Sequence, residues 1–330
     1  IALMSCVSAA GLSATGSGES QVLEEVFVTA TKRSESIQDV PLAITALSGD
    51  FTRNVNINDV KDLVSFTPGV SGNSQDSFID AISVRGIRTQ DFGVGGDPSA
   101  AFFKNDLYEG RNGSAVTSLF DMERSEVLRG PQGFLFGRNS IGGAFSVHTA
   151  KASIKDGVTG YIDVDAAENS HMAIEGAVNV PVNDKFALRF AGYRSEEDGF
   201  VKNRFDGSEL IEFEKSAFRV SGTYEGNNVT VKGMAEYEDR DQSGSVYRAI
   251  EKGEIWDTFE AALGDIDLRG GAYDVDVDRA RGDADDSKIL TLGLQIDYEF
   301  DFATLTSNTG WKDHEYFYTE DYDGTPLTIN

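Results

Sequence analysis

Few residues in this chain could carry out catalysis or bind a metal. Cys6 is the sole cysteine, which excludes an intramolecular disulfide and a zinc site built from cysteines. The histidines His148, His171 and His314 are far apart in the sequence and lack the H-x-x-x-H spacing of a metal centre. The sequence also contains no G-x-S-x-G elbow and no Walker loop. We therefore expect no enzyme, no metal and no cofactor.

Aspartates crowd the range 274–286, where their oxygens could bind calcium. An EF-hand loop that began at Asp274 would need glycine at its sixth position, which is Arg279, and its twelfth position would be Asp285. The match is poor, so we interpret this range as a solvated acidic loop. Calcium binding stays open as the alternative.

Composition and charge narrow the class of protein. The net charge is −26 and the pI about 4.4, so repulsion from phosphate argues against nucleic acid as a partner. Hydrophobic residues make up 40% of the chain, which suits neither a disordered chain nor a helical membrane protein. No stretch approaches the ~18 to 20 continuous apolar residues of a spanning helix. If this chain crosses a membrane, it does so with strands.

The most distinctive stretch runs from Glu126 to Val147 and is rich in glycine. Its first residues can extend as a strand, and Gly130-Pro131 must turn. The later glycines allow backbone conformations or close approaches that a Cβ would hinder. This segment is therefore suited to packing inside a confined space, although a glycine-rich connection in a soluble α+β domain would have the same composition.

The order of residues from Leu128 to Ala144, L-R-G-P-Q-G-x-L-F-G-R-N-S-I-G-G-A, resembles the plug signature of TonB-dependent outer-membrane receptors. The family pattern continues upstream as S-V-R-G at 83–86, Y-x-G-R at 108–111 and L-F-D-x-E-R at 119–124, with Ser125 where an apolar residue is expected. The resemblance assigns the signature to Arg85, Gly86, Arg124, Arg129, Gly130, Pro131, Gly133, Gly137, Gly142 and Gly143.

The resemblance also implies roles for side chains. Arg85 and Arg129 match plug arginines that pair with barrel carboxylates and hold the plug as a latch; otherwise they are arginines of turns. Acidic residues of the expected barrel wall are candidate partners, namely Asp163, Asp165, Glu175, Asp297 and Glu299. The alternative is that the family's partners lie on strands outside this sequence. The plug loops expected to face the ligand contain Gln75, Asp76, Gln90, Phe92, Arg111 and Asn112.

A short β-prone run precedes the plug. In the family such a run is the TonB box, which pairs as an added strand with the energy-coupling protein TonB. The alternative is that the run is simply the first plug strand. The resemblance assigns the box to Glu25, Val26, Phe27, Val28, Thr29 and Ala30.

The N-terminal residues are apolar and small and are typical of the end of a secretory signal, with cleavage near Ala10 or Ala14.

The resemblance implies a barrel of 22 strands, whereas the sequence shows about seven. We therefore expect the N-terminal part of a longer protein, truncated at both ends. We divide it into signal remnant and linker (1–20), TonB box and linker (21–34), plug (35–152) and the first part of the barrel (153–330).

Short elements alternate within the expected plug. The sequence predicts a strand at 40–47 and, after Ser48 as N-cap, a short helix. Helical spacing predicts a second helix at 59–66, and 81–88 returns to a strand. A hairpin is expected around Lys104-Asn105-Asp106.

From Gly157 onward apolar residues alternate with polar ones, as between Lys288 and Phe300. Side chains alternate across a strand, so each strand has one apolar and one polar face. A soluble sandwich shares this pattern, but short links alternating with long ones at 196–212 and 240–287 favour an outer-membrane barrel. Aromatic residues expected to form its interfacial girdles are Tyr161, Tyr193, Tyr224, Tyr237, Tyr298 and Trp311.

The sequence therefore predicts an N-terminal α+β plug domain followed by antiparallel transmembrane strands of an incomplete β-barrel. The resemblance implies active uptake across the outer membrane of a Gram-negative bacterium, with TonB and outer-membrane lipid as partners. It implies a scarce solute, first a ferric siderophore, as cargo. Cobalamin, haem or a glycan remains open as cargo, and a secreted β-rich binding module remains the alternative outside transport.

Overall fold

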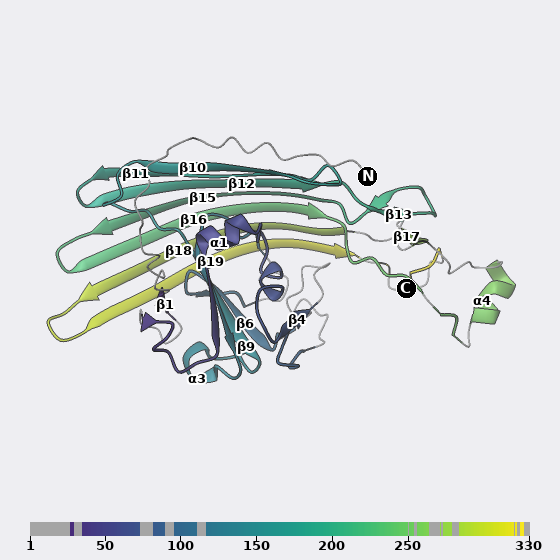
Figure 1. Cartoon of the computed structure of the whole chain (residues 1–330), viewed down its shortest axis with the longest axis horizontal. Helices are drawn as coiled ribbons and strands as arrows, with labels where there is room; N and C mark the ends of the chain where they lie inside the picture. The colour runs from purple at the N-terminus through teal and green to yellow at the C-terminus, as the bar shows by residue number, and fades with distance from the viewer. Residues whose placement is uncertain are drawn as a thin grey trace, which may run out of the picture.

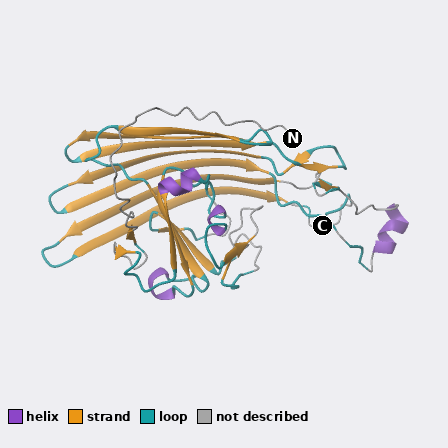
Figure 2. Cartoon of the chain, viewed as in Figure 1, coloured by secondary structure: helices purple, strands orange, loops and turns teal. Residues whose placement is uncertain are grey.

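Two β-sheets dominate the computed structural model, one long and one short (Figure 2). The structure describes residues 27–29, 35–72, 82–89, 96–110, 117–249, 251–253, 256–263, 271, 273–278, 284–319, 321 and 324–326. No helix in this part of the chain is long and apolar enough to cross a membrane.

The long sheet, called the wall below, has seven antiparallel strands paired in the order β10-β11-β12-β15-β16-β18-β19. Their number agrees with the seven expected from alternation. Each strand is joined to its neighbour along the chain, which makes a simple up-and-down sheet (Figure 1). The strands are Thr159–Ala166, Met172–Asn183, Phe186–Glu197, Phe213–Glu225, Val229–Gln242, Ala284–Glu299 and Thr304–Thr319.

The two faces of the wall differ as the alternation predicts. On β18, Leu290, Leu292 and Leu294 are exposed on the outer face, whereas Ile289 and Thr291 on either side of Leu290 are buried. The outer face therefore presents apolar side chains to the surroundings. The inner face packs against the N-terminal domain (Figure 1).

Connections between the wall strands alternate in length, also as predicted. The turns β11–β12, β15–β16 and β18–β19 lie at one end of the wall, and the long connections lie at the other end together with the β10–β11 turn at 167–171 (Figure 1). The first long connection contains β13 (Val201–Asn203) and β14 (Glu209–Leu210), and the second contains α4 (Trp256–Leu263) and β17 (Asp274–Val275). Strand β13 pairs in parallel with β17, which ties the two long connections together.

The described parts of the range 274–286, which are 274–278 and 284–286, do not form the solvated loop that the aspartates suggested. Val275 and Val277 are buried against Val201 and Leu210, and Asp285 lies within β18 with no exposed surface. Pairing with β13 buries the apolar residues that alternate with the aspartates. Among the described residues, no three His, Cys, Asp or Glu side chains are arranged to hold a metal ion.

The N-terminal domain is built on a five-stranded sheet in the order β3-β8-β9-β6-β7. Strands β6 and β9 are parallel, and the other pairs are antiparallel. The strands are β3 Ile44–Ser48, β6 Ala100–Lys104, β7 Leu107–Tyr108, β8 Met122–Arg129 and β9 Gly143–Thr149. Two further pairs are β1 (Phe27–Val28) with β2 (Glu35–Ser36) and β4 (Val70–Gly72) with β5 (Ile82–Val84). The helices are α1 Gly49–Asn54, the 3₁₀ helix η1 Asp62–Val64 and α3 Gly133–Phe136.

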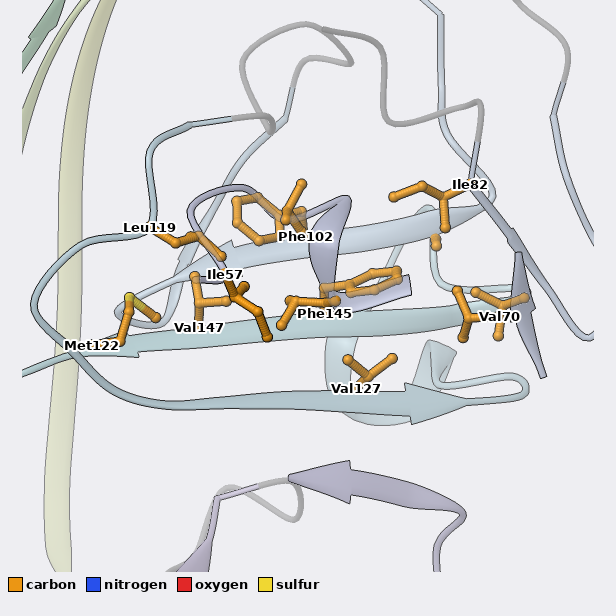
Figure 3. Close-up of a cluster of buried hydrophobic side chains, with 13 residues drawn as sticks. Ile57, Val70, Ile82, Phe102, Leu119, Met122, Val127, Phe145 and Val147 are labelled. Atoms are coloured by element: carbon orange, nitrogen blue, oxygen red, sulfur yellow. The ribbon is translucent and has the colours of Figure 1, made fainter. Parts of the chain in front are cut away.

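Apolar side chains cover both faces of this sheet. On one face Phe102, Val127 and Phe145 pack with Val70 and Ile82 of the β4–β5 pair, as Figure 3 shows. On the other face Leu128 and Phe103 pack with Val28, Val40 and Phe136. Burial on both faces makes the sheet the core of the domain.

Several local predictions can now be scored. Ser48 caps α1, since its Oγ accepts from the backbone N–H of Phe51. The hairpin of β6 and β7 turns through Asn105 and Asp106, both with positive φ, as a tight hairpin turn requires.

Two other elements are shorter than predicted. The predicted helix at 59–66 is only the single turn η1, because the Asp62 carboxylate accepts from the N–H groups of Asn58 and Asp59 and closes a local turn instead. The strand expected at 81–88 ends at Val84, because Arg85 has a φ of 53° and turns the chain.

Gly143 is a position where a side chain does not fit. A Cβ there would overlap the carbonyl oxygen of Leu128 and lie 3.3 Å from Cγ1 of Val84. We expect Gly143→Ala to destabilise the domain by about 1–3 kcal/mol through overpacking, measured as the free energy of opening from hydrogen exchange of β8 and β9. Gly133→Ala is the control, because a Cβ at Gly133 meets nothing within 4 Å and α3 favours alanine. If β8 were equally protected from hydrogen exchange in both variants, a Cβ at Gly143 would not destabilise the domain, contrary to this prediction.

Candidate functional site

Five charged side chains join the N-terminal domain to the wall, and we call them the charge chain. Lys104 Nζ lies 2.5 Å from Oε1 of Glu236, and Arg219 Nη1 lies 2.9 Å from its Oε2. The other arm of the Arg219 guanidinium reaches Asp121 Oδ2 at 3.2 Å, and Arg189 Nε donates to the same oxygen at 2.8 Å. Lys104 and Asp121 belong to the N-terminal domain, and the other three belong to the wall.

The charge chain is removed from water. Lys104, Asp121, Arg219 and Glu236 are each at most 5% exposed. Charges that are buried to this extent persist only when they are paired and hydrogen-bonded. Arg219 meets this condition, because it also donates to the backbone oxygens of Phe120 and Asp121.

Packing around Phe120 positions the charge chain. The segment before β8 packs against the inner face of the wall. The centroid of the Phe120 ring lies 4.4 Å from the guanidinium carbon of Arg219. The Tyr193 ring stacks on Phe120 with centroids 6.1 Å apart. The aromatic pair packs against small side chains of the wall, namely Ala177, Ala191 and Ala217.

Two further contacts hold the same side of the domain. Glu238 accepts from the backbone N–H of Ser118 at 3.1 Å, and its side chain is buried. Lys312 on β19 pairs with Glu109, just after β7. The β6–β7 hairpin and the segment before β8 are therefore both attached to the wall.

The segment predicted as a TonB box packs partly on the N-terminal domain. Val28 is fully buried, whereas Phe27 is 53% exposed. The Thr29 N–H donates to Glu126 Oε1 at 2.9 Å, and Arg124 Nη2 donates to Thr29 Oγ1 at 3.1 Å. Figure 1 places β1 toward the end of the wall that carries the short turns. Glu25, Val26 and Ala30 lie outside the described residues.

The two signature arginines contact the same turn, because the backbone N–H of Arg85 donates to the carbonyl of Gly69 and Arg129 reaches Pro68. Arg85 Nη1 lies 3.2 Å from where a Cβ on Gly130 would be, and Arg129 Nη1 donates to the carbonyl of Pro68 at 2.7 Å. Among the described residues, neither arginine pairs with a carboxylate, and Nε of Arg129 is buried without a hydrogen bond. The latch role of these arginines stays a prediction.

The candidate partners of Arg129 have other contacts. Glu175 accepts from the N–H of Asp121 and from Tyr161, and Asp297 pairs with Lys232. Glu175 and Asp297 are thus bound to other groups, and the pairing of Arg129 with a barrel carboxylate stays a prediction. Asp163 and Asp165 line a separate polar cavity of about 90 Å³ beside α1, and Glu299 is exposed.

The remaining signature residues fall at turns and close contacts. Gly130 and Gly137 have φ of 104° and 76°, and Pro131 follows the first of them. Gly142 approaches the carbonyl of Ser99, and Gly86 continues the positive-φ turn of Arg85. The predicted ligand-facing residues all lie outside the described residues: Gln75, Asp76, Gln90, Phe92, Arg111 and Asn112.

Two of the six predicted girdle aromatics face the other way. Tyr193 is 6% exposed and packs on Phe120, and the Tyr161 hydroxyl donates to Glu175 on the inner face. The register of β10 places Ile162 and Val164 on the outer face instead. The other four are exposed on the outer face, namely Tyr224, Tyr237, Tyr298 and Trp311.

Sequence reasoning identified none of the charge chain as a site. The available signal was weak: Arg189 and Arg219 occupy polar positions of the alternation, next to the small residues Ala191 and Ala217. Long side chains beside alanines on one face of a strand indicate a surface that another domain covers. Their shared partner Asp121 lies 68 residues from Arg189 and 98 residues from Arg219, so these contacts between domains could not be paired from the sequence.

Comparisons with known proteins agree with this architecture. A family model described as the TonB-dependent Receptor Plug Domain matches residues 36–144. The chain is 22% identical over 247 residues to the ferripyoverdine receptor of Pseudomonas aeruginosa, an alignment that covers 71% of this chain and 30% of that protein. Residues 36–144 therefore belong to the plug-domain family of TonB-dependent receptors. The N-terminal domain is a receptor plug, and the wall consists of barrel strands.

A solved receptor structure confirms the fold. The ferric yersiniabactin uptake receptor of Yersinia pestis superposes with a TM-score of 0.68 at 19% identity, covering 83% of this chain and 41% of that one. The vitamin B12 transporter of Vibrio vulnificus is 25% identical over 190 residues, or 56% of this chain and 30% of that protein. The chain thus spans less than half the length of these receptors. Among the described strands, β10 and β19 are the edges of the wall. The location of the chain is the outer membrane of a Gram-negative bacterium.

Proposed function

We propose that this chain forms the plug and the first barrel strands of a receptor that actively takes up a scarce solute across the outer membrane. The charge chain carries this proposal. A plug attached to the inner face of a barrel wall by buried charges obstructs the lumen, and breaking such pairs is costly. Solute passage would therefore need an energy input that rearranges the plug.

TonB is the proposed source of that input. The exposed side chain of Phe27 and the short strand β1 would offer an edge for strand addition, in which backbone hydrogen bonds supply affinity. The position of β1 near the short turns supports this, because short turns face the periplasm in outer-membrane barrels. The domain limits and the latch of Arg85 and Arg129 belong to the same proposal, and the barrel partners of these arginines would lie on other strands.

The cargo we propose first is a ferric siderophore. Relatives named for ferripyoverdine and ferric yersiniabactin support it, while the vitamin B12 transporter is a relative with another cargo. A secreted binding module fits the molecule less well, because the outer face of the wall exposes a continuous row of Leu290, Leu292, Leu294 and Ile296. Lipid rather than water is the natural surrounding of such a face.

Uptake in cells tests this function. Cells that lack their own iron receptors would express the complete receptor that contains this chain, with and without TonB, and accumulation of radioactive ferric chelates would be measured. We expect accumulation only with TonB, and surface binding in both strains. Accumulation that is equal in the two strains would contradict energised uptake.

A further inference from the structure

A small three-stranded sheet, called the outer sheet below, is shared by the two long connections of the wall. Its strands are paired in the order β14-β13-β17. Strands β13 and β14 come from the first long connection and pair with each other, whereas β17 comes from the second long connection and pairs with β13. Figure 1 places β13 and β17 beyond the end of the wall that carries the long connections. The outer sheet therefore joins two connections that leave the wall separately.

The side chain of Asn203, at the end of β13, binds the backbone of the second long connection. Asn203 has no exposed surface. Its Nδ2 donates to the carbonyl oxygen of Val277 at 2.9 Å, and the N–H of Val277 donates to its Oδ1 at 3.1 Å. The same Oδ1 accepts from the N–H of Phe205 at 3.2 Å, within the first long connection. Without this side chain, buried backbone groups of both connections would lose their hydrogen bonds, which is costly.

The outer sheet has a hydrophobic cluster of its own, and both connections contribute to it. Val201 and Leu210 come from the first long connection, and Val275 and Val277 come from the second. Each of these four side chains is at most 7% exposed. If the two connections separated, all four would lose part of their apolar contact and meet water. Burial of this cluster therefore depends on both connections at once.

The strands of the outer sheet are too short to be stable separately. Strand β13 has three residues, and β14 and β17 have two each. Even a complete two-stranded hairpin is marginally stable at best in water. Across the two connections, the N–H of Lys202 donates to the carbonyl of Tyr273 at 2.8 Å. The N–H of Arg204 likewise donates to the carbonyl of Val275 at 2.8 Å. Each connection thus supplies hydrogen-bond partners that the other needs in order to stay folded.

We propose that the first long connection and the β17 part of the second form one cooperative unit, which folds, opens and moves as a single body. Two independent lids would have to break the Asn203 contacts and expose Leu210 each time one of them moved alone. Segments that share a buried core and hydrogen bonds open together in hydrogen exchange. The inference rests on the proposed uptake function only where uptake is the measured quantity.

Hydrogen exchange of the purified complete receptor in detergent tests whether the two connections unfold together. Asn203→Ala changes only the first long connection, but it should speed exchange about 5- to 100-fold in the peptides of both β13 and β17. Asn228→Ala is the control, because Asn228 is an exposed residue of the turn between β15 and β16, and it should change neither peptide. Faster exchange in the β13 peptides alone overturns the proposal.

A reversible crosslink tests whether the two connections separate during uptake. Lys202 and Asp274 are Cα partners in the pairing of β13 with β17, and neighbouring strands lie ~4.8 Å apart, within the reach of a disulfide. Uptake of radioactive ferric chelate would be measured for the double variant Lys202→Cys with Asp274→Cys, oxidised and then reduced. We expect the two rates to agree within about threefold, because a single body needs no separation of its strands. A larger loss on oxidation that reduction restores overturns the proposal, and Lys202→Cys alone is the control for a stray disulfide.

The two measurements separate this inference from the uptake function. Hydrogen exchange requires neither TonB nor a solute, so its result stands even if uptake proves independent of TonB. If reduced receptor takes up the chelate only with TonB while the oxidised form is blocked, the uptake function stands and the cooperative unit fails. Leu210→Ala supplies the exchange test if Asn203→Ala does not fold, because it removes a core side chain of the first long connection and should also speed exchange of the β17 peptides.

Discussion

Glu236→Ala is expected to loosen the attachment of the plug more than any other single substitution in the charge chain. Among the described residues its carboxylate is the only acid bound to Lys104, whose remaining partners there are Thr117 and the carbonyl of Ser118 at 3.4 Å. The substitution would leave a buried ammonium without a counter-charge and remove one of the two acids at Arg219. Breaking one side of a buried pair costs about 3–5 kcal/mol.

Hydrogen exchange of β6 in the complete receptor would measure this loss as a change in the free energy of opening. The double variant Lys104→Met with Glu236→Gln removes both charges and should lose less than Glu236→Ala alone, because no charge is left stranded. Glu299→Ala, an exposed carboxylate on the same wall, should change the value by no more than about 0.5 kcal/mol. If the double variant lowered the free energy of opening more than Glu236→Ala does, the pair would stabilise the plug through packing and not through charge.

The strands of the wall could be predicted because their information is local. Apolar and polar residues alternate from Lys288 to Phe300 because the strand has an apolar outer face and an inner face that is more polar. In β18 the apolar residues do lie on the outer face. Connection lengths likewise follow from where alternation stops. The start of β18 could not be predicted, because Asp285 and Asp286 are unfavourable strand residues until pairing with β19 and contact with Gln242 hold them.

The charge chain could not be predicted, because its geometry depends on how two domains meet. Asp121 and Arg219 are 98 residues apart, and Lys104 and Glu236 are 132 apart. Nothing in the strand pattern distinguishes an inward charge that faces water from one that faces the plug. The same reason explains Tyr193, which was expected at the membrane interface and instead packs on Phe120.

Ser125 shows a limit of reasoning from a family pattern. It occupies a position where an apolar residue was expected, and it is fully buried in β8, where its hydroxyl has no hydrogen-bond partner among the described residues. The pattern therefore predicted the environment correctly although the residue type differs. An unpaired buried hydroxyl costs about 1–3 kcal/mol, so β8 carries a local penalty that other core residues offset.

Phe27→Pro is expected to abolish energised uptake while leaving solute binding at the cell surface nearly unchanged. Proline removes a backbone donor from β1, the strand that we propose pairs with TonB. Phe27 suits this test better than Val28, because its side chain is 53% exposed whereas Val28 is part of the plug core. A substitution at Val28 would mix the loss of coupling with the loss of core packing.

Phe27→Ala is the matched control, since it removes the same exposed ring but keeps the N–H. We expect Phe27→Ala to retain most of the uptake rate, because strand addition depends chiefly on backbone hydrogen bonds. The measurement is uptake of radioactive ferric chelate, together with surface binding at matched expression. Normal uptake in Phe27→Pro would show that β1 serves only as a plug strand, anchored by Thr29 on Glu126. Loss of surface binding in Phe27→Pro would instead show that β1 supports the shape of the binding face, and that coupling must be sought elsewhere in the chain.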